Sequence, residues 1–139
     1  MTISEIRNRI GSRSSTRDDL LFLENKIQKL RQTVFDEERD RPEMLEPAER
    51  VVRFDKLVQQ LRAEIRALER AEALSKEDRI SNAGNLTTLR DNLENAVIHH
   101  ARVREEFMNL ADSSPKHAEY VKLVAMAEQV FFQITGLRN

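Results

Sequence analysis

The chain of 139 residues contains no cysteine, which excludes disulfide bonds, thiolate metal sites and a cysteine nucleophile. It has no tryptophan, and aromatic residues make up only 5% of it. Only three glycines and three prolines occur, and these are the residues that interrupt helices most strongly. The composition is therefore typical of a charged protein with long helices, and the lack of cysteine fits a reducing compartment.

The chain also lacks an excess of charge of one sign, since 23 basic residues stand against 24 acidic ones. This balance argues against a dedicated nucleic-acid binder, which usually carries a strong basic excess. No apolar run approaches the ~20 residues that a membrane span needs, and the N-terminus lacks the apolar core of a signal peptide. We expect a protein of the cytoplasm, or of a particle assembled there, with no membrane partner.

Four stretches of the chain carry apolar residues at alternating spacings of three and four. This is the repeat of a helix that buries one stripe of its surface. The four stripes lie within residues 20–34, 51–68, 86–110 and 120–134. Such regular stripes predict four long amphipathic helices that pack on one another.

Capping residues set the expected ends of the helices. Thr2 and Glu5 have the spacing of a capping box at the start of a short first helix, and Gly11 is expected to end that helix in the left-handed conformation. Gly84 is expected to interrupt the helical structure before the third long helix, and Gly136 is expected to end the fourth. The four long helices are expected over about 16–40, 47–74, 85–111 and 115–136.

Short connections force neighbouring helices to run antiparallel. The first two long helices are therefore expected to form one hairpin and the last two a second hairpin. The predicted fold is all-α: an antiparallel four-helix bundle or a pair of helical hairpins, with a short extra N-terminal helix. Residues 1–14 form the short helix and a basic hinge, and residues 15–139 form a single helical domain. An elongated hairpin that buries its second face against another copy is the competing arrangement.

The histidines are the first candidates for chemistry. His100 lies in phase with the third stripe, as a hydrogen-bonded core residue would. Adjacent residues on a helix diverge by about 100°, so His99 and His100 cannot share a metal ion. The Glu-x-x-His pairs of di-iron bundles are absent, and Glu69 and Glu72 lie among arginines, as on a solvated ion-pair face. We expect no catalytic residue, no cofactor and no metal site.

The last helix is apolar over much of its circumference, more than one buried stripe requires. This surface is either a wide face buried within a monomer or a contact with another subunit, since monomers seldom expose large apolar patches. The N-terminal segment is basic, and could dock on the acidic residues 36–49 of a neighbouring copy. The residues expected to contact a partner are Arg7, Arg9, Arg13, Leu123, Val130, Phe132 and Leu137.

The expected function is that of a non-enzymatic assembly component that binds other protein subunits through apolar helix faces. A structural subunit of a virion or other large complex, an adaptor and a chaperone-like module all fit, as a homo-oligomer or within a larger assembly. The alternative is a nucleic-acid-associated regulator that uses the basic arm with Arg62, Arg66 and Arg70. The two differ in their response to salt, which weakens phosphate contacts but not apolar association.

Overall fold

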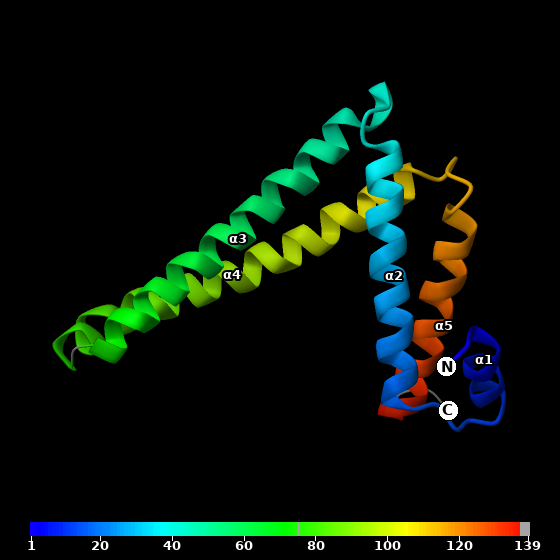
Figure 1. Ribbon diagram of the computed structural model, residues 1–139, viewed down its shortest axis with the longest axis horizontal. Helices are drawn as coiled ribbons and strands as arrows, with labels where there is room; N and C mark the ends of the chain where they lie inside the picture. Colours follow the sequence, from blue (N-terminus) through cyan, green and yellow to red (C-terminus); the bar gives the residue numbers. More distant parts are fainter. Residues whose placement is uncertain (75, 137–139) are drawn as a thin grey trace. The chain divides into compact units, whose positions relative to one another are not determined.

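The computed structural model describes residues 1–74 and 76–136, with the side chains of residues 71–82 left undescribed. Over these residues the chain is all-helical, which confirms the predicted fold class. The elements are α1 (Ile3–Gly11), α2 (Arg17–Glu38), the 3₁₀ helix η1 (Pro42–Met44), α3 (Leu45–Leu74), α4 (Lys76–Leu110) and α5 (His117–Thr135) (Figure 1).

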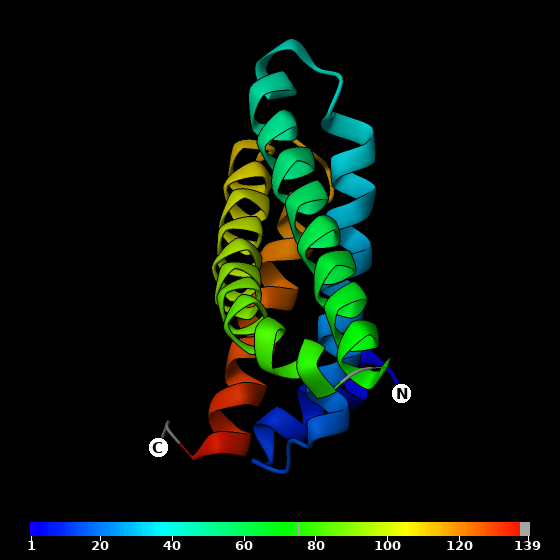
Figure 2. The same cartoon turned by 90° about the vertical axis from the view of Figure 1, so that its left-hand side faces the viewer.

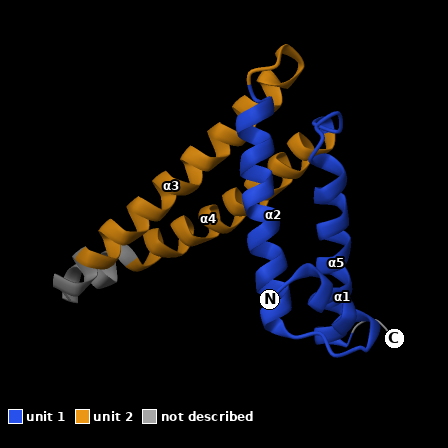
Figure 3. Ribbon diagram, turned by 45° about the vertical axis from the view of Figure 1, so that its right-hand side comes forward, with its two compact units in different colours: residues 1–39, 110–139 blue, residues 40–109 orange. Residues whose placement is uncertain are grey.

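The chain divides into two compact units (Figure 3). Unit 1 consists of residues 1–39 and 110–139, and unit 2 consists of residues 40–109. The short helix α1 belongs to the same unit as α2 and α5. The predicted packing of the four long helices into one bundle, and the predicted single domain over residues 15–139, stay predictions.

Helix α2 packs on α5 in unit 1, and the two run antiparallel. At one end of the pair Lys116 forms an ion pair with Glu37, and at the other the Ser15 hydroxyl donates to Gln133 Oε1 at 2.6 Å. The first long helix was expected to form a hairpin with the second; within unit 1 it pairs with the last. The apolar stripes could not predict this pairing. A stripe indicates that one face of a helix is buried, but it does not indicate which other helix buries it.

A buried carboxylate fastens α1 to the start of α2. Arg9 donates to both oxygens of Asp19, with Nη2–Oδ1 at 2.6 Å and Nε–Oδ2 at 2.8 Å. Asp19 also completes a capping box with Thr16, in which each residue accepts a hydrogen bond from the other's backbone N–H. The hydrogen bonds from Arg9 hold the pKa of Asp19 below its usual value.

The end of α1 differs from the prediction. Gly11 is the last helical residue, but the left-handed conformation falls on Arg13, with φ of 57°. In place of a glycine cap, Gln133 on α5 pairs with a carbonyl group at the end of α1. Its side-chain amide donates to the carbonyl oxygen of Ile10 at 2.9 Å. The chain therefore leaves α1 by a turn that α5 holds in place, rather than by a glycine cap.

Unit 2 contains a hairpin of α3 and α4, which run side by side in both Figure 1 and Figure 2. Its core contains Val58 and Leu61 from α3 and Ala96 from α4, with Leu89 and Leu93 packed against them. Two ion pairs join the same helices along their length: Arg50–Glu106 at 3.6 Å and Glu69–Arg90 at 3.3 Å.

Several of the predicted helix ends shift, and α3 begins at Leu45, two residues before the expected residue 47. Gly84 was expected to break the chain, but it lies within α4, which continues from Lys76 to Leu110. Helix α5 begins at His117, two residues after Pro115. The prediction that Gly136 ends the last helix is confirmed, since it has a φ of 69° and its N–H donates to the carbonyl of Phe132. Ser75, which with Asp78 has the spacing of a capping box in the sequence, lies outside the described residues.

Candidate functional site

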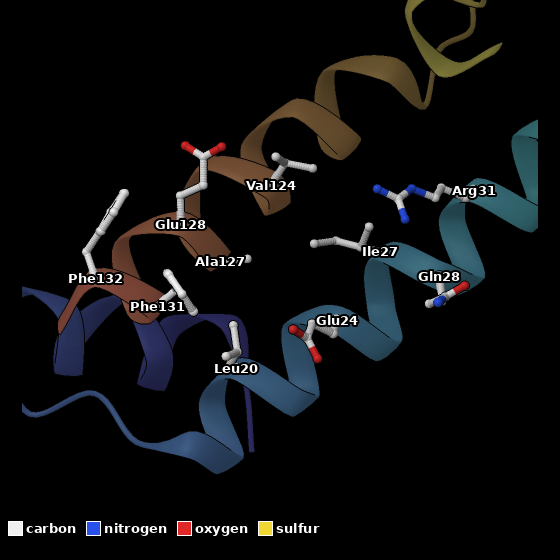
Figure 4. Close-up of a pocket in the computed structure, with 10 residues that line it drawn as sticks. All are labelled: Leu20, Glu24, Ile27, Gln28, Arg31, Val124, Ala127, Glu128, Phe131 and Phe132. Atoms are coloured by element: carbon white, nitrogen blue, oxygen red, sulfur yellow. The ribbon is translucent and has the colours of Figure 1, made fainter. Parts of the chain in front are cut away.

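An open groove of about 430 Å³ runs between α2 and α5 in unit 1. Figure 4 shows its lining side chains projecting from the two helices. Most of the lining is apolar, with charged or amide side chains among it. The apolar residues are Leu20, Ile27, Val124, Ala127, Phe131 and Phe132, and the polar ones are Glu24, Gln28, Arg31 and Glu128.

Large apolar side chains in and beside the groove face the outside of the chain. Phe131 within the groove is 44% exposed. Leu21 on α2 and Val121 on α5 are 57% and 50% exposed, and the helical repeat places each on the flank of its helix next to the groove. A groove with apolar margins of this kind is typical of a surface that binds another protein.

The charges in the groove are unevenly placed. Glu24 and Glu128 lie on opposite walls toward the end that holds Leu20 and Phe131, and Arg31 lies toward the other end (Figure 4). Arg31 donates from Nη2 to the Tyr120 hydroxyl at 3.4 Å, and its guanidinium lies 5.6 Å from the centre of that ring. The groove therefore has an acidic end and a basic end.

The three arginines predicted to contact a partner have different surroundings. Arg7 and Arg13 are exposed. Arg9 is bonded to Asp19 within the same chain. The basic arm thus uses one of its charges to hold α1 in place, and this charge is not free for an acidic surface of a neighbouring copy.

The four apolar residues predicted to contact a partner also differ in position. Leu123 and Val130 are 5% and 0% exposed, so their side chains are inaccessible to a partner in this conformation. Phe132 is partly exposed and lines the groove. Leu137 lies outside the described residues. Of the predicted set, Phe132 is the residue that the structure places at the groove.

The apolar groove residues other than Phe132 were expected from the sequence to lie in the core. Leu20, Ile27, Val124 and Phe131 belong to the first and fourth stripes, which indeed face each other, but the two stripes do not close completely. Ala127 is one signal that could have shown this, because its small side chain leaves space on the α5 wall.

The histidines of α4 lie against α3. His100 is 15% exposed in its side chain, and its Nε2 lies 4.0 Å from Asp55 Oδ1. Burial lowers the pKa of His100, and the charge of Arg104 lowers it further against the opposite effect of Asp55. The His99 ring stacks on Phe54 with 5.6 Å between ring centres. Among the described residues, no three His, Asp or Glu side chains are grouped so that they could hold a metal ion.

Comparison with protein-family models, with curated proteins and with solved structures finds no match to this chain. Over the part of the chain that the structure describes, none of the helices has both the length and the apolar character that crossing a membrane requires.

Proposed function

We propose that this chain is a non-enzymatic assembly module that binds a helical segment of another protein subunit in the groove between α2 and α5. The observation that carries the proposal is the exposure of Phe131, 44% of its surface, within a groove whose lining is mostly apolar. An amphipathic helix binds by burying its apolar face in a groove, and the exposed phenylalanine and the apolar lining provide the surface for that contact.

The dimensions of the groove suit such an occupant. Leu20 and Arg31 mark its extent along α2, and the eleven helical steps between them span about 16 Å. A partner helix of about three turns would place three apolar side chains along this length. Each large apolar side chain that is fully buried contributes roughly 1.5–3 kcal/mol, against an association cost of at least ~4 kcal/mol. We therefore expect specific binding of moderate strength.

A nucleic-acid role receives less support. The N-terminal arm carries no aromatic side chain that could stack on a base, and Arg9 is committed to Asp19. Since the chain has no cysteine, we further propose that it acts in the cytoplasm or in a particle assembled there.

Site-specific photocrosslinking tests the proposal in the cells that naturally produce the chain. A photoreactive phenylalanine analogue is placed at Phe131, and at Gln129 as a matched control. Gln129 is exposed on the same helix, about 200° round from Phe131. We expect protein adducts from position 131 and few from position 129. Equal labelling from both positions, or none from 131, would contradict a role of the groove in protein binding.

A further inference from the structure

The groove carries carboxylates that lack a partner within the described chain. Glu24 on α2 and Glu128 on α5 lie on opposite walls of the groove. Among the residues that the structure describes, neither side chain forms an ion pair or a hydrogen bond. Two unpaired carboxylates at one end of an apolar groove favour an occupant with a positive charge at that end.

Arg31, toward the other end, has donors to spare. A guanidinium has five N–H donors, and among the described residues Arg31 uses one, in its hydrogen bond to Tyr120. Its Nε is buried and has no hydrogen-bond partner there. Arg31 as a whole is only partly buried, so its positive charge and remaining donors favour an occupant that brings a carboxylate to this end.

The spacing of these charges identifies an occupant that satisfies both ends. Glu24 and Arg31 are seven residues apart, which is two helical turns, so they share one face of α2 at a separation of about 10 Å along the axis. Ile27 and Gln28 lie midway between them. A two-fold axis across the groove at this midpoint would place Glu24 of each copy against Arg31 of the other.

We propose that the groove is filled by the same groove of a second copy, related by a two-fold axis that passes near Ile27 and Gln28. This inference rests on the proposed protein-binding role of the groove and names its partner. In the dimer, Glu24 of each copy approaches Arg31 of the partner copy, and Glu128 adds negative charge at the same end of the groove. The exposed Phe131 and the apolar lining are buried in the same contact. Four helices, α2 and α5 from each copy, surround the axis.

The first experiment uses the absence of cysteine. Any disulfide formed by a single-cysteine variant of this chain must join two copies. Gln28→Cys places the thiol beside the axis, where two cysteines come close enough to bond. Lys29→Cys is the control, because the next residue along α2 points about 100° away. Under mild oxidation we expect Gln28→Cys to form covalent dimers at a rate that dilution reduces only weakly, and Lys29→Cys to remain monomeric.

The second experiment tests the charge pairing by measuring the mass of the purified full chain in solution. The unaltered chain is expected at twice its 16.2 kDa. Glu24→Arg and Arg31→Glu each place like charges together, and each should weaken the dimer at least ~10-fold. An equimolar mixture of the two variants restores both pairs and should recover the dimer. Lys29→Glu, on the far side of α2, should leave it unchanged.

The outcomes separate this inference from the proposed function. A monomeric chain at high concentration, or a dimer that none of these substitutions weakens, overturns the two-fold contact. Weakened variants that the mixture does not restore overturn it as well. If the inference fails while position 131 still crosslinks to a different protein, the groove binds a foreign helix and the proposed function stands. If neither a second copy nor another protein is captured, both fail.

Discussion

Replacing Ile6 by alanine tests whether α1 is an integral part of unit 1. The Ile6 side chain is fully buried, and α1 packs on α5. The substitution removes three carbon atoms, which corresponds to about 2.4 kcal/mol at ~0.8 kcal/mol for each buried group. A remaining cavity adds to this loss. The expected decrease in the free energy of unfolding is therefore about 2–3 kcal/mol.

Ile3→Ala provides the matched control. Ile3 belongs to the same helix, but its side chain is only partly buried, so we expect a decrease of about 1 kcal/mol or less. The free energies of unfolding are measured by urea titration followed by far-ultraviolet circular dichroism. Hydrogen exchange adds a local readout. A nine-residue helix is not stable alone. In Ile6→Ala the backbone amides of α1 should therefore lose more of their protection from exchange than those of α2.

Two results would refute this reasoning. If Ile6→Ala and Ile3→Ala destabilise the chain equally, burial does not determine the contribution of α1. If Ile6→Ala leaves the exchange of the α1 amides unchanged, the helix is held by its polar contacts and not by its apolar side chain.

Three further predictions concern stability and its dependence on pH. Because the hydrogen bonds from Arg9 lower the pKa of Asp19, that pair stabilises the fold above about pH 4 and loses its contribution as the pH falls below that value. Urea titrations between about pH 5 and 2 should show a shallower loss for Arg9→Met than for the unaltered chain, and parallel curves would contradict this. Burial lowers the pKa of His100, so below about pH 6.5 the unfolded chain takes up a proton at this residue before the folded chain does. The His100→Gln variant should therefore lose less stability than the unaltered chain between about pH 7 and 5. Equal changes in the free energy of unfolding with pH would rule this out. Beyond its own turn of helix, a methyl group on Gly84 meets no described atom within 4 Å, whereas Gly136 has a positive φ. Thermal unfolding should therefore show Gly84→Ala to be stabilising by about 0.5–1 kcal/mol and Gly136→Ala to be destabilising by about 1 kcal/mol. The same sign for both substitutions would be inconsistent with their backbone conformations.

The helices themselves could be predicted from the sequence, because amphipathic stripes and capping residues are local signals. Thr2 and Gly136 each act at the helix end that the pattern indicates. Gly84 does not interrupt α4, because a glycine in a helix costs only about 1 kcal/mol relative to alanine. Packing of neighbours such as Leu86, which is buried in the same helix, outweighs that amount.

The pairing of helices and the groove could not be predicted in the same way. Every stripe is compatible with every other stripe, so the partner of α2 depends on the packing of the whole chain. Whether two stripes close completely depends on side-chain size at facing positions, and Ala127 leaves room that a larger residue would fill. Arg9 was expected to contact a partner, because no local pattern indicates that Asp19, ten residues later, accepts its hydrogen bonds.

Unit 1 is made from the two ends of the chain, with unit 2 inserted between them. The ribosome therefore delivers α2 early, and α5 emerges only after all of α3 and α4, at roughly 5–20 residues per second. Throughout that interval the face of α2 that is buried in the folded chain, including Leu23 and Val34, lacks α5. The hairpin of α3 and α4 can already form, because its contacts are close in sequence. A messenger RNA truncated after the α3–α4 hairpin would yield a polypeptide in which the apolar face of α2 stays exposed. Such a face is what chaperones and proteases bind.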